Sequence, residues 1–131
     1  MSNGPVPDVT FCLAFGCDEL SVSVMRQVLG DTLRGLGVAE ESVYDILLAA
    51  TEACTSVLRA PGYSIVTTLT GTRCQVEVTG PGCRSRRLTV ARACVDHVTL
   101  RRRPGRGAVV TMRTHISWSW DAPLRRLAAA S

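Results

Sequence analysis

The hydrophobic and polar positions of the first half of the chain predict one strand followed by two helices. At residues 9–15 apolar and polar side chains alternate, which is typical of a strand with one buried face. Over about 20–36 and again over about 40–59, apolar residues recur every three or four positions, which predicts two amphipathic helices. Gly37 is placed to end the first of these helices.

The middle of the chain begins with two alternating runs, about 63–70 and 73–79, joined by Gly71-Thr72. So short a connection favours an antiparallel hairpin. A glycine-rich loop at 80–85 leads into a third predicted helix. The apolar stripe of that helix consists of Leu88, Ala91, Val95 and Val98.

The chain closes with a second predicted hairpin, formed by a strand to about Arg103, a turn at 104–107 and a strand at 108–117. The side chains expected to share one face of the last strand are Val110, Met112, Thr114, Ile116 and Trp118. The predicted order is therefore βααββαββ. Antiparallel strands with helices between them favour an α+β fold in which the helices cover one face of a sheet.

Length and composition indicate a single soluble domain. The chain has 131 residues, with 46% hydrophobic and 20% charged positions, which excludes wholesale disorder. We expect a core over about 9–117 and a tail at 118–131, in which the Ala-rich stretch 121–131 is frayed or forms a loose helical turn. No apolar run approaches the roughly 20 residues that span a bilayer, and no signal peptide is evident at the N-terminus. We therefore expect a cytoplasmic protein that does not enter the membrane.

The six cysteines are expected to be reduced in that compartment. No pair has the CxxC spacing and there are only two histidines, so we expect no metal site. Cys17 and Cys83 fall in predicted loops and are the candidates for reactive thiols. The cysteines of periodic segments, expected as small core residues, are Cys12, Cys54, Cys74 and Cys94.

The net charge is +4, and the basic residues are all arginine. They are concentrated at Arg84, Arg86, Arg87, Arg92, Arg101, Arg102, Arg103 and Arg106. Asp96 is the only acidic residue within that stretch. Such a run indicates either a solvated face or an anionic partner. Nucleic acid is poorly supported, because Trp118 and Trp120 lie beyond the run and no nucleic-acid-binding signature is evident.

Two local motifs contain residue types that are used in catalysis or in ligand binding. Glu52 and Ser56 lie one helical turn apart and therefore point to the same side, where they either orient water or a metal ion or form a solvated face. Thr79-Gly80-Pro81-Gly82 lies between a strand and a helix. Such a segment either brings its backbone N–H groups close to a phosphate or is a plain turn. His97 and His115 have no partner suggested by spacing, and we assign no nucleophilic triad.

Four segments together resemble the anti-sigma factor serine kinase branch of the GHKL ATPases. Glu52-Ala53-Cys54-Thr55-Ser56 is similar to the family's Glu-Ala-x-Thr-Asn helix motif. Residues 76–82 resemble the strand that enters its Asp-x-Gly-x-Gly box. Residues 86–98 resemble the helix after the nucleotide lid, and residues 107–113 resemble the closing Gly-Thr strand. The resemblance implies a Bergerat-type two-layer α/β sandwich with a mixed, mostly antiparallel sheet.

The resemblance also implies a nucleotide site, but several of its positions carry other residues. Glu52 would be the general base, whereas Ser56 replaces the magnesium-binding Asn. The adenine-binding Asp corresponds to Val78, or to Thr79 if a gap is allowed. The remaining positions of the expected degenerate site are Gly80, Gly82, Arg86, Arg87 and Gly107, with Ser85 and Arg87 replacing lid glycines and Ala108 replacing the Thr of the last box.

These replacements predict a regulatory protein-binding module with no catalytic residues and no cofactor. The resemblance implies a sigma factor or an anti-sigma antagonist as partner, and also a homodimer. One alternative is an active serine kinase that uses Mg-ATP or ADP, with Glu52 as base and Ser56 holding magnesium. A second alternative is a nucleic-acid or acidic-partner binder that uses the arginine-rich surface.

Overall fold

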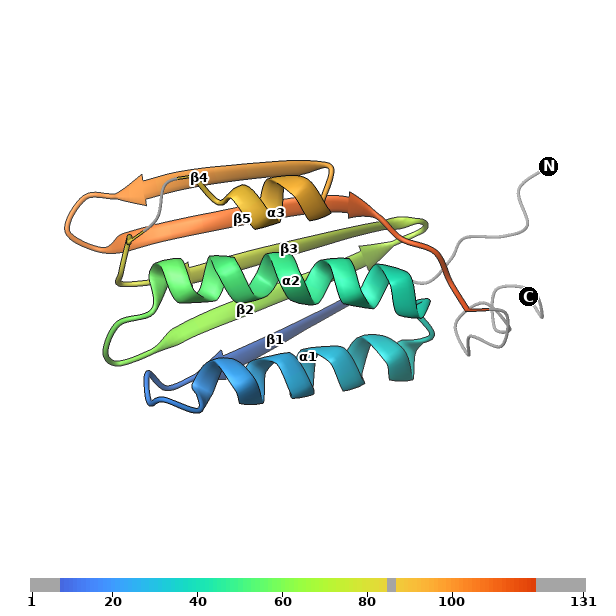
Figure 1. Cartoon of the computed structure of the whole chain (residues 1–131), viewed down its shortest axis with the longest axis horizontal. Helices are drawn as coiled ribbons and strands as arrows, with labels where there is room; N and C mark the ends of the chain where they lie inside the picture. The colour runs from blue at the N-terminus through green and yellow to red at the C-terminus, as the bar shows by residue number, and fades with distance from the viewer. Residues whose placement is uncertain (1–7, 85–86, 120–131) are drawn as a thin grey trace.

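In a computed structural model that describes residues 8–84 and 87–119, three helices cover one face of a five-stranded sheet (Figure 1). The elements are β1 (Val9–Phe15), α1 (Ser21–Leu36), α2 (Glu40–Val57), β2 (Tyr63–Thr70), β3 (Arg73–Gly80), α3 (Thr89–Cys94), β4 (His97–Arg103) and β5 (Gly107–His115). The strands lie in the order β1-β2-β3-β5-β4, and every neighbouring pair is antiparallel. The α+β two-layer fold is confirmed, although the sheet is wholly antiparallel rather than mixed.

The helices form where the apolar periodicity places them. Met25, Leu29 and Leu33 are fully buried along one side of α1, which is the side that faces the sheet layer. Gly37 ends α1 in the left-handed conformation, with φ of 100°, and its N–H donates to the carbonyl of Arg34. Left-handed backbone of this kind is the usual helix terminator and favours glycine.

Between the layers, the core is filled by alternate residues of the strands and by the inner sides of the helices. Ile65 of β2, Val78 of β3 and Val110 of β5 are fully buried against Ala50, Cys54 and Val57 of α2 and their neighbours. The alternate residues of the same strands point away from the helices and form a second, open face of the sheet. We call this the outer face.

The third helix is shorter than predicted. It ends at Cys94, and Val98 belongs to β4 rather than to a helical stripe. The strand begins here because residues 97–103 pair with residues 107–113 of β5. Asp96 adds to this pairing, since its carboxylate accepts the backbone N–H of His115 at 2.9 Å. Sheet hydrogen bonds thus outweigh the local helical pattern.

Beyond β5, Trp118 and Ser119 contact the connection between α1 and α2. Trp118 pairs with Val38, and Ser119 donates to the carbonyl of Gly37 at 2.7 Å. The indole N–H of Trp118 donates to the carbonyl of Gly71 at 2.8 Å, which holds this segment against the β2–β3 turn. The rest of the predicted tail, from residue 120 onward, lies outside the described residues.

One expectation for the core is wrong. Cys12 is exposed, because it lies on the outer face of β1 and not on the face toward the helices. Cys54 and Cys74 are buried as expected, and Cys94 is half-buried. In the part of the chain that the structure describes, no helix is both long enough and apolar enough to cross a bilayer.

Candidate functional site

The carboxylate of Glu52 is directed at the first turn of α3. Its Oε1 accepts the backbone N–H of Ala91 at 2.8 Å, and its Oε2 accepts the N–H of Val90 at 3.2 Å. These amides belong to the first turn of the helix, where no intrahelical partner exists for them. Glu52 therefore supplies from α2 the cap that α3 lacks on its own chain, since no side chain at its N-cap position makes a hydrogen bond.

Leu88, the residue before α3, helps to hold that helix against α2. Leu88 adopts a left-handed backbone conformation, with φ of 47° and ψ of 47°, which costs a non-glycine residue about 1–2 kcal/mol. Its side chain is fully buried between the layers, and burial of a leucine contributes about 1.5–3 kcal/mol. The buried Leu88 and the Glu52 cap together fix α3 against α2.

The expected magnesium position, Ser56, is covered by the loop after β3. Ser56 is only 2% exposed, and its carbonyl accepts the backbone N–H of Arg84 at 2.8 Å. The adjacent Val57 carbonyl accepts the N–H of Gly82, also at 2.8 Å. The loop after β3 therefore satisfies the last carbonyls of α2. Backbone N–H groups that would face a phosphate in an open loop are used within the protein.

The glycines of the expected phosphate loop are needed for close packing. A Cβ at Gly80 would lie 2.6 Å from the carbonyl oxygen of Val57, which is a severe clash. Gly107 has φ of 89°, and a Cβ there would overlap the carbonyl oxygen of Gly80 and the backbone of Pro81. These glycines let β3, β5 and the end of α2 approach one another closely, so their presence does not require a bound phosphate.

The register of β3 decides between the two candidates for the adenine position. Val78 is fully buried and faces the helices, whereas Thr79 lies on the outer face and pairs with Ser64 and Val109. Only Val78 can line the space between the layers. An isopropyl group there cannot accept a hydrogen bond from an adenine amine.

Of the arginines near α3, Arg92 makes side-chain hydrogen bonds within the protein. Arg92 donates from Nε to the carbonyl of Arg87 at 2.9 Å and from Nη1 to the carbonyl of Val98 at 3.2 Å. It thus ties the loop, α3 and β4 together. Arg84 and Arg87 are exposed, and Arg86 lies outside the described residues.

The other arginines of the basic patch gather at the β4–β5 turn. Arg101, Arg102, Arg103, Pro104 and Arg106 line a cavity of about 500 Å³ there, and their side chains are exposed. Arg102 is paired with Ala108, and Ala108 is paired with Gly80, so this turn lies at the same end of the sheet as the loop after β3. We call these residues, with Arg84 and Arg87, the basic end of the sheet.

The metal-ligating side chains of the described residues are scattered, and the cysteines differ in burial. Within residues 8–84 and 87–119, no cluster of three or more His, Cys, Asp or Glu side chains has a metal-binding arrangement. Burial raises the pKa of the Cys54 and Cys74 thiols to about 12, which keeps both protonated at neutral pH. Of the two loop cysteines, Cys17 is exposed and Cys83 is half-buried.

Taken together, the described residues do not fit a nucleotide–magnesium complex. Glu52 is used as a helix cap, Ser56 is buried under the loop, and Val78 is apolar. We derive no phosphoryl transfer through this site.

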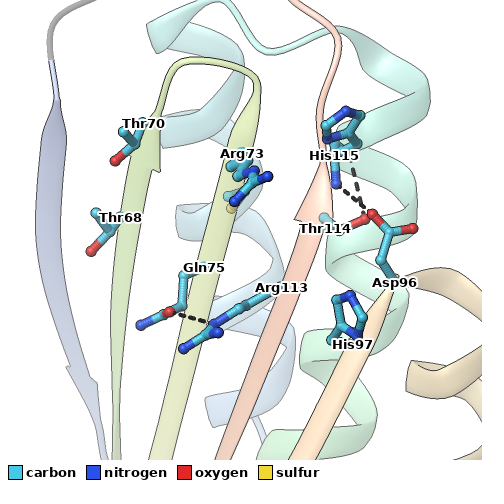
Figure 2. Close-up of a pocket in the computed structure, with 10 residues that line it drawn as sticks. Thr68, Thr70, Arg73, Gln75, Asp96, His97, Arg113, Thr114 and His115 are labelled. Atoms are coloured by element: carbon cyan, nitrogen blue, oxygen red, sulfur yellow. Dashed lines mark hydrogen bonds between the residues drawn. The ribbon is translucent and has the colours of Figure 1, made fainter.

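Sequence reasoning missed a second cavity, of about 690 Å³, on the outer face of the sheet (Figure 2). It brings together His97, His115, Arg73 and Arg113, which are separated by up to 42 positions in the chain, from residue 73 to residue 115. The alternation of β3 and β5 indicates which residues share the outer face. Which of them become neighbours depends on the register of three strands.

Three helices on one face of a five-stranded antiparallel sheet make an α+β two-layer sandwich, and a solved structure shares this fold. One solved structure with this fold contains the RsbU and RsbW domains of Rv1364c from Mycobacterium tuberculosis, with a TM-score of 0.73 and 16% sequence identity. The match covers 82% of this chain and 32% of that chain, and at this identity it shows the fold alone. No protein-family model and no curated protein matches the sequence.

Proposed function

We propose that this protein is a regulatory binding module that uses an RsbW-like fold without a working nucleotide site. The observation that carries the proposal is the pair of hydrogen bonds from Val90 and Ala91 to the Glu52 carboxylate. A general base must be within hydrogen-bond reach of the proton that it removes, and this carboxylate is instead engaged by two backbone amides. The fold then serves to present a surface to a partner.

The expected loss of nucleotide affinity is large. A hydrogen bond to a charged group contributes about 1.5–3 kcal/mol, so losing the magnesium and adenine contacts at Ser56 and Val78 costs about 3–6 kcal/mol. This corresponds to roughly 10²–10⁴-fold in affinity, which converts a micromolar site into a millimolar one. Binding would also require α3 and the loop at Gly82 to separate from α2.

Isothermal titration calorimetry with Mg-ATP and with Mg-ADP tests this proposal. We expect no binding tighter than about 100 μM. Tighter binding that is lost in a Val78→Trp variant, whose bulk would fill the space between the layers, would contradict it. Circular dichroism must show that this variant is folded.

The active-kinase alternative makes a different prediction. Phosphate would pass from Mg-ATP to a serine of a co-purified antagonist protein, and Glu52→Gln would abolish the transfer. The binding-module proposal predicts no transfer by either protein. Radiolabelled ATP with wild type and Glu52→Gln side by side separates the two, because a signal present only in wild type supports the kinase.

The proposed partner is a sigma factor or a small anti-sigma antagonist protein. The basic end of the sheet supports an acidic docking surface on that partner, because four exposed arginines surround the β4–β5 turn. In a pull-down from the native host, we expect such a protein to be retained by wild type and lost with Arg101→Glu/Arg103→Glu. Arg26→Glu on α1 is the control for a general change of charge. Equal retention by both variants would place the docking surface elsewhere.

Nucleic acid remains the competing anionic partner for the same arginines. Its binding would weaken steeply with salt, because neutralised phosphates release counterions. We expect no DNA or RNA binding at physiological salt in fluorescence-anisotropy titrations. Submicromolar binding with a steep salt dependence would favour the nucleic-acid alternative instead.

A homodimer is proposed through the edge of β1. The strand VTFCLAF has no charged residue, whereas the opposite edge strand, β4, ends in Arg101, Arg102 and Arg103. Exposed edges without charges are ready to pair with another strand. Light scattering across a range of protein concentrations tests the oligomeric state, and a monomer at every concentration would contradict this part of the proposal.

A further inference from the structure

The outer-face cavity lies on the side of the sheet away from the helices (Figure 2). Its volume of about 690 Å³ is within the range of small-molecule sites, about 300–1,000 Å³. Residues from β2, β3 and β5 line it, together with the beginning of β4. Because the candidate nucleotide site lies between the layers, the two sites are separated by the sheet itself.

The strand register places basic residues beside one another in this cavity. Arg73 of β3 is directly opposite His115 of β5. Arg113 of β5 is directly opposite Gln75 on one side and His97 of β4 on the other. Side chains at directly opposed positions are about 4.5–5.5 Å apart at Cβ, and diagonal neighbours are within reach of an arginine. Two guanidinium groups and two imidazoles therefore share one small surface.

This positive charge has little compensation within the protein. Among the described residues, the salt bridges involve Arg34 only, so neither Arg73 nor Arg113 has an ion pair there. Asp96 is the only acidic residue that lines the cavity, and one of its carboxylate oxygens accepts the backbone N–H of His115. Glu77 lies on the same face of β3 but does not line the cavity.

One of the arginines is held in place. Nε of Arg113 donates to the side-chain oxygen of Gln75 at 2.9 Å, as the dashed line in Figure 2 shows. This contact uses Nε and fixes the plane of the guanidinium group. In the described structure both Nη groups of Arg113 have no hydrogen-bond partner, so they are available to a ligand. A pre-oriented guanidinium loses less side-chain entropy on binding.

The lining residues also indicate the kind of ligand. No Phe, Tyr or Trp side chain lines the cavity, so a stacked nucleobase has only imidazole rings to stack on. Thr68 and Thr70 of β2 add hydroxyl groups that donate or accept hydrogen bonds. A carboxylate is satisfied by one guanidinium fork, whereas a phosphate has more oxygens to be bonded from several directions. Two arginines from different strands therefore match a phosphate better than a carboxylate.

We propose that the outer-face cavity is a binding site for a phosphate group, with Arg73 and Arg113 as its principal ligands and His97 and His115 at its side. The shared chemistry is that of a phosphomonoester. The phosphomonoester belongs either to a small metabolite or to a phosphorylated serine. The site is independent of the proposed loss of nucleotide binding.

Nuclear magnetic resonance titration of the full chain tests the proposal with inorganic phosphate, glucose 6-phosphate, O-phosphoserine and acetate at constant ionic strength. We expect saturable shifts of the amides of residues 73–75, 96–97 and 113–115, and at least tenfold tighter binding of phosphate than of acetate. The relative affinities of glucose 6-phosphate and O-phosphoserine distinguish the two sources. Shifts confined to the basic end of the sheet, or equal affinity for acetate, would overturn the site.

Variants provide the second measurement. Arg113→Gln and, separately, Arg73→Gln should each weaken phosphate binding at least tenfold, whereas Arg26→Gln on the helix layer removes the same charge and should leave the affinity unchanged. Both arginines are exposed at the surface of strands, and circular dichroism checks that each variant is folded. Equal affinity of all three variants would show that the cavity does not bind phosphate. The same variants tell whether any ATP detected by calorimetry binds here or between the layers.

Discussion

The side chain of Glu52 on α2 and the backbone N–H of Ala91 on α3 are joined by a hydrogen bond of 2.8 Å. A second bond from Val90 makes the carboxylate a two-point cap on the start of α3. A residue whose sequence context resembles a catalytic base therefore has a structural role in this protein. Removal of the carboxylate should therefore lower the free energy of unfolding.

We expect Glu52→Ala to lower the free energy of unfolding by about 1–3 kcal/mol, because it removes a helix cap and two hydrogen bonds to a charged acceptor. Glu52→Gln should cost less, since its amide oxygen can still accept one bond. Urea denaturation followed by circular dichroism measures both. Glu19→Ala, in an exposed loop, is the control and should change stability by less than about 0.5 kcal/mol. If Glu52→Ala is as stable as that control, the capping role is wrong.

Gly107→Ala should be far more destabilising than Gly105→Ala. Both glycines have positive φ, 89° and 70°, so each substitution carries the cost of left-handed backbone, about 1–2 kcal/mol. At Gly105 nothing lies within 4 Å of the new methyl group, whereas at Gly107 it would overlap Gly80 and Pro81. We expect a loss of at least about 3 kcal/mol, or failure to fold, for Gly107→Ala alone. Thermal denaturation of the pair measures the difference, and equal melting temperatures would contradict the close packing.

Stability should fall with rising pH above about 9. Burial raises the pKa of Cys54 and Cys74 to about 12, so the native state keeps protons that the unfolded chain loses above the usual thiol value of 9.0. The native state then binds more protons than the unfolded state, and the free energy of unfolding decreases between about pH 9 and pH 12. At pH 10 the expected loss is on the order of 1 kcal/mol for each thiol. Urea denaturation at pH 8 and pH 10 measures it, and Cys17→Ala should show the same loss as wild type.

The same burial predicts the order in which the thiols react. Cys12 and Cys17 are exposed and should be labelled rapidly by a thiol reagent at pH 8, whereas Cys54 and Cys74 should be labelled only as fast as the protein unfolds. Peptide mass spectrometry after timed labelling resolves each site. Rapid labelling of Cys54 in the folded protein would contradict its burial between α2 and the sheet.

Trp118 should contribute to stability although it follows the last strand. Trp118→Phe keeps an aromatic ring but removes the hydrogen bond to the carbonyl of Gly71, and we expect a loss of about 0.5–1.5 kcal/mol. Trp118→Ala also removes apolar contacts with the core and should cost about 3 kcal/mol or more. Urea denaturation of the two variants separates the hydrogen bond from the packing. No loss in either would mean that the segment does not hold the β2–β3 turn.

Much of the fold was predictable because it depends on local patterns. The alternation at residues 9–15, the helical period at 21–36 and the glycine at position 37 each describe a short stretch of chain whose conformation follows from its own neighbours. The third helix was overestimated for the same reason. Its local pattern is helical as far as Val98, but pairing with β5 takes over at His97.

The sequence by itself determined the order of the elements, their buried faces and most of their ends, since period and turn chemistry are encoded within a few residues. The tertiary structure alone decided that Glu52 caps a helix 38–39 positions away and that Val78 rather than Thr79 faces the helices. It also decided that Arg73, Arg113 and two histidines meet in one cavity. These relationships depend on strand register and layer packing, which are set by the whole chain at once and not by the residues near any one position.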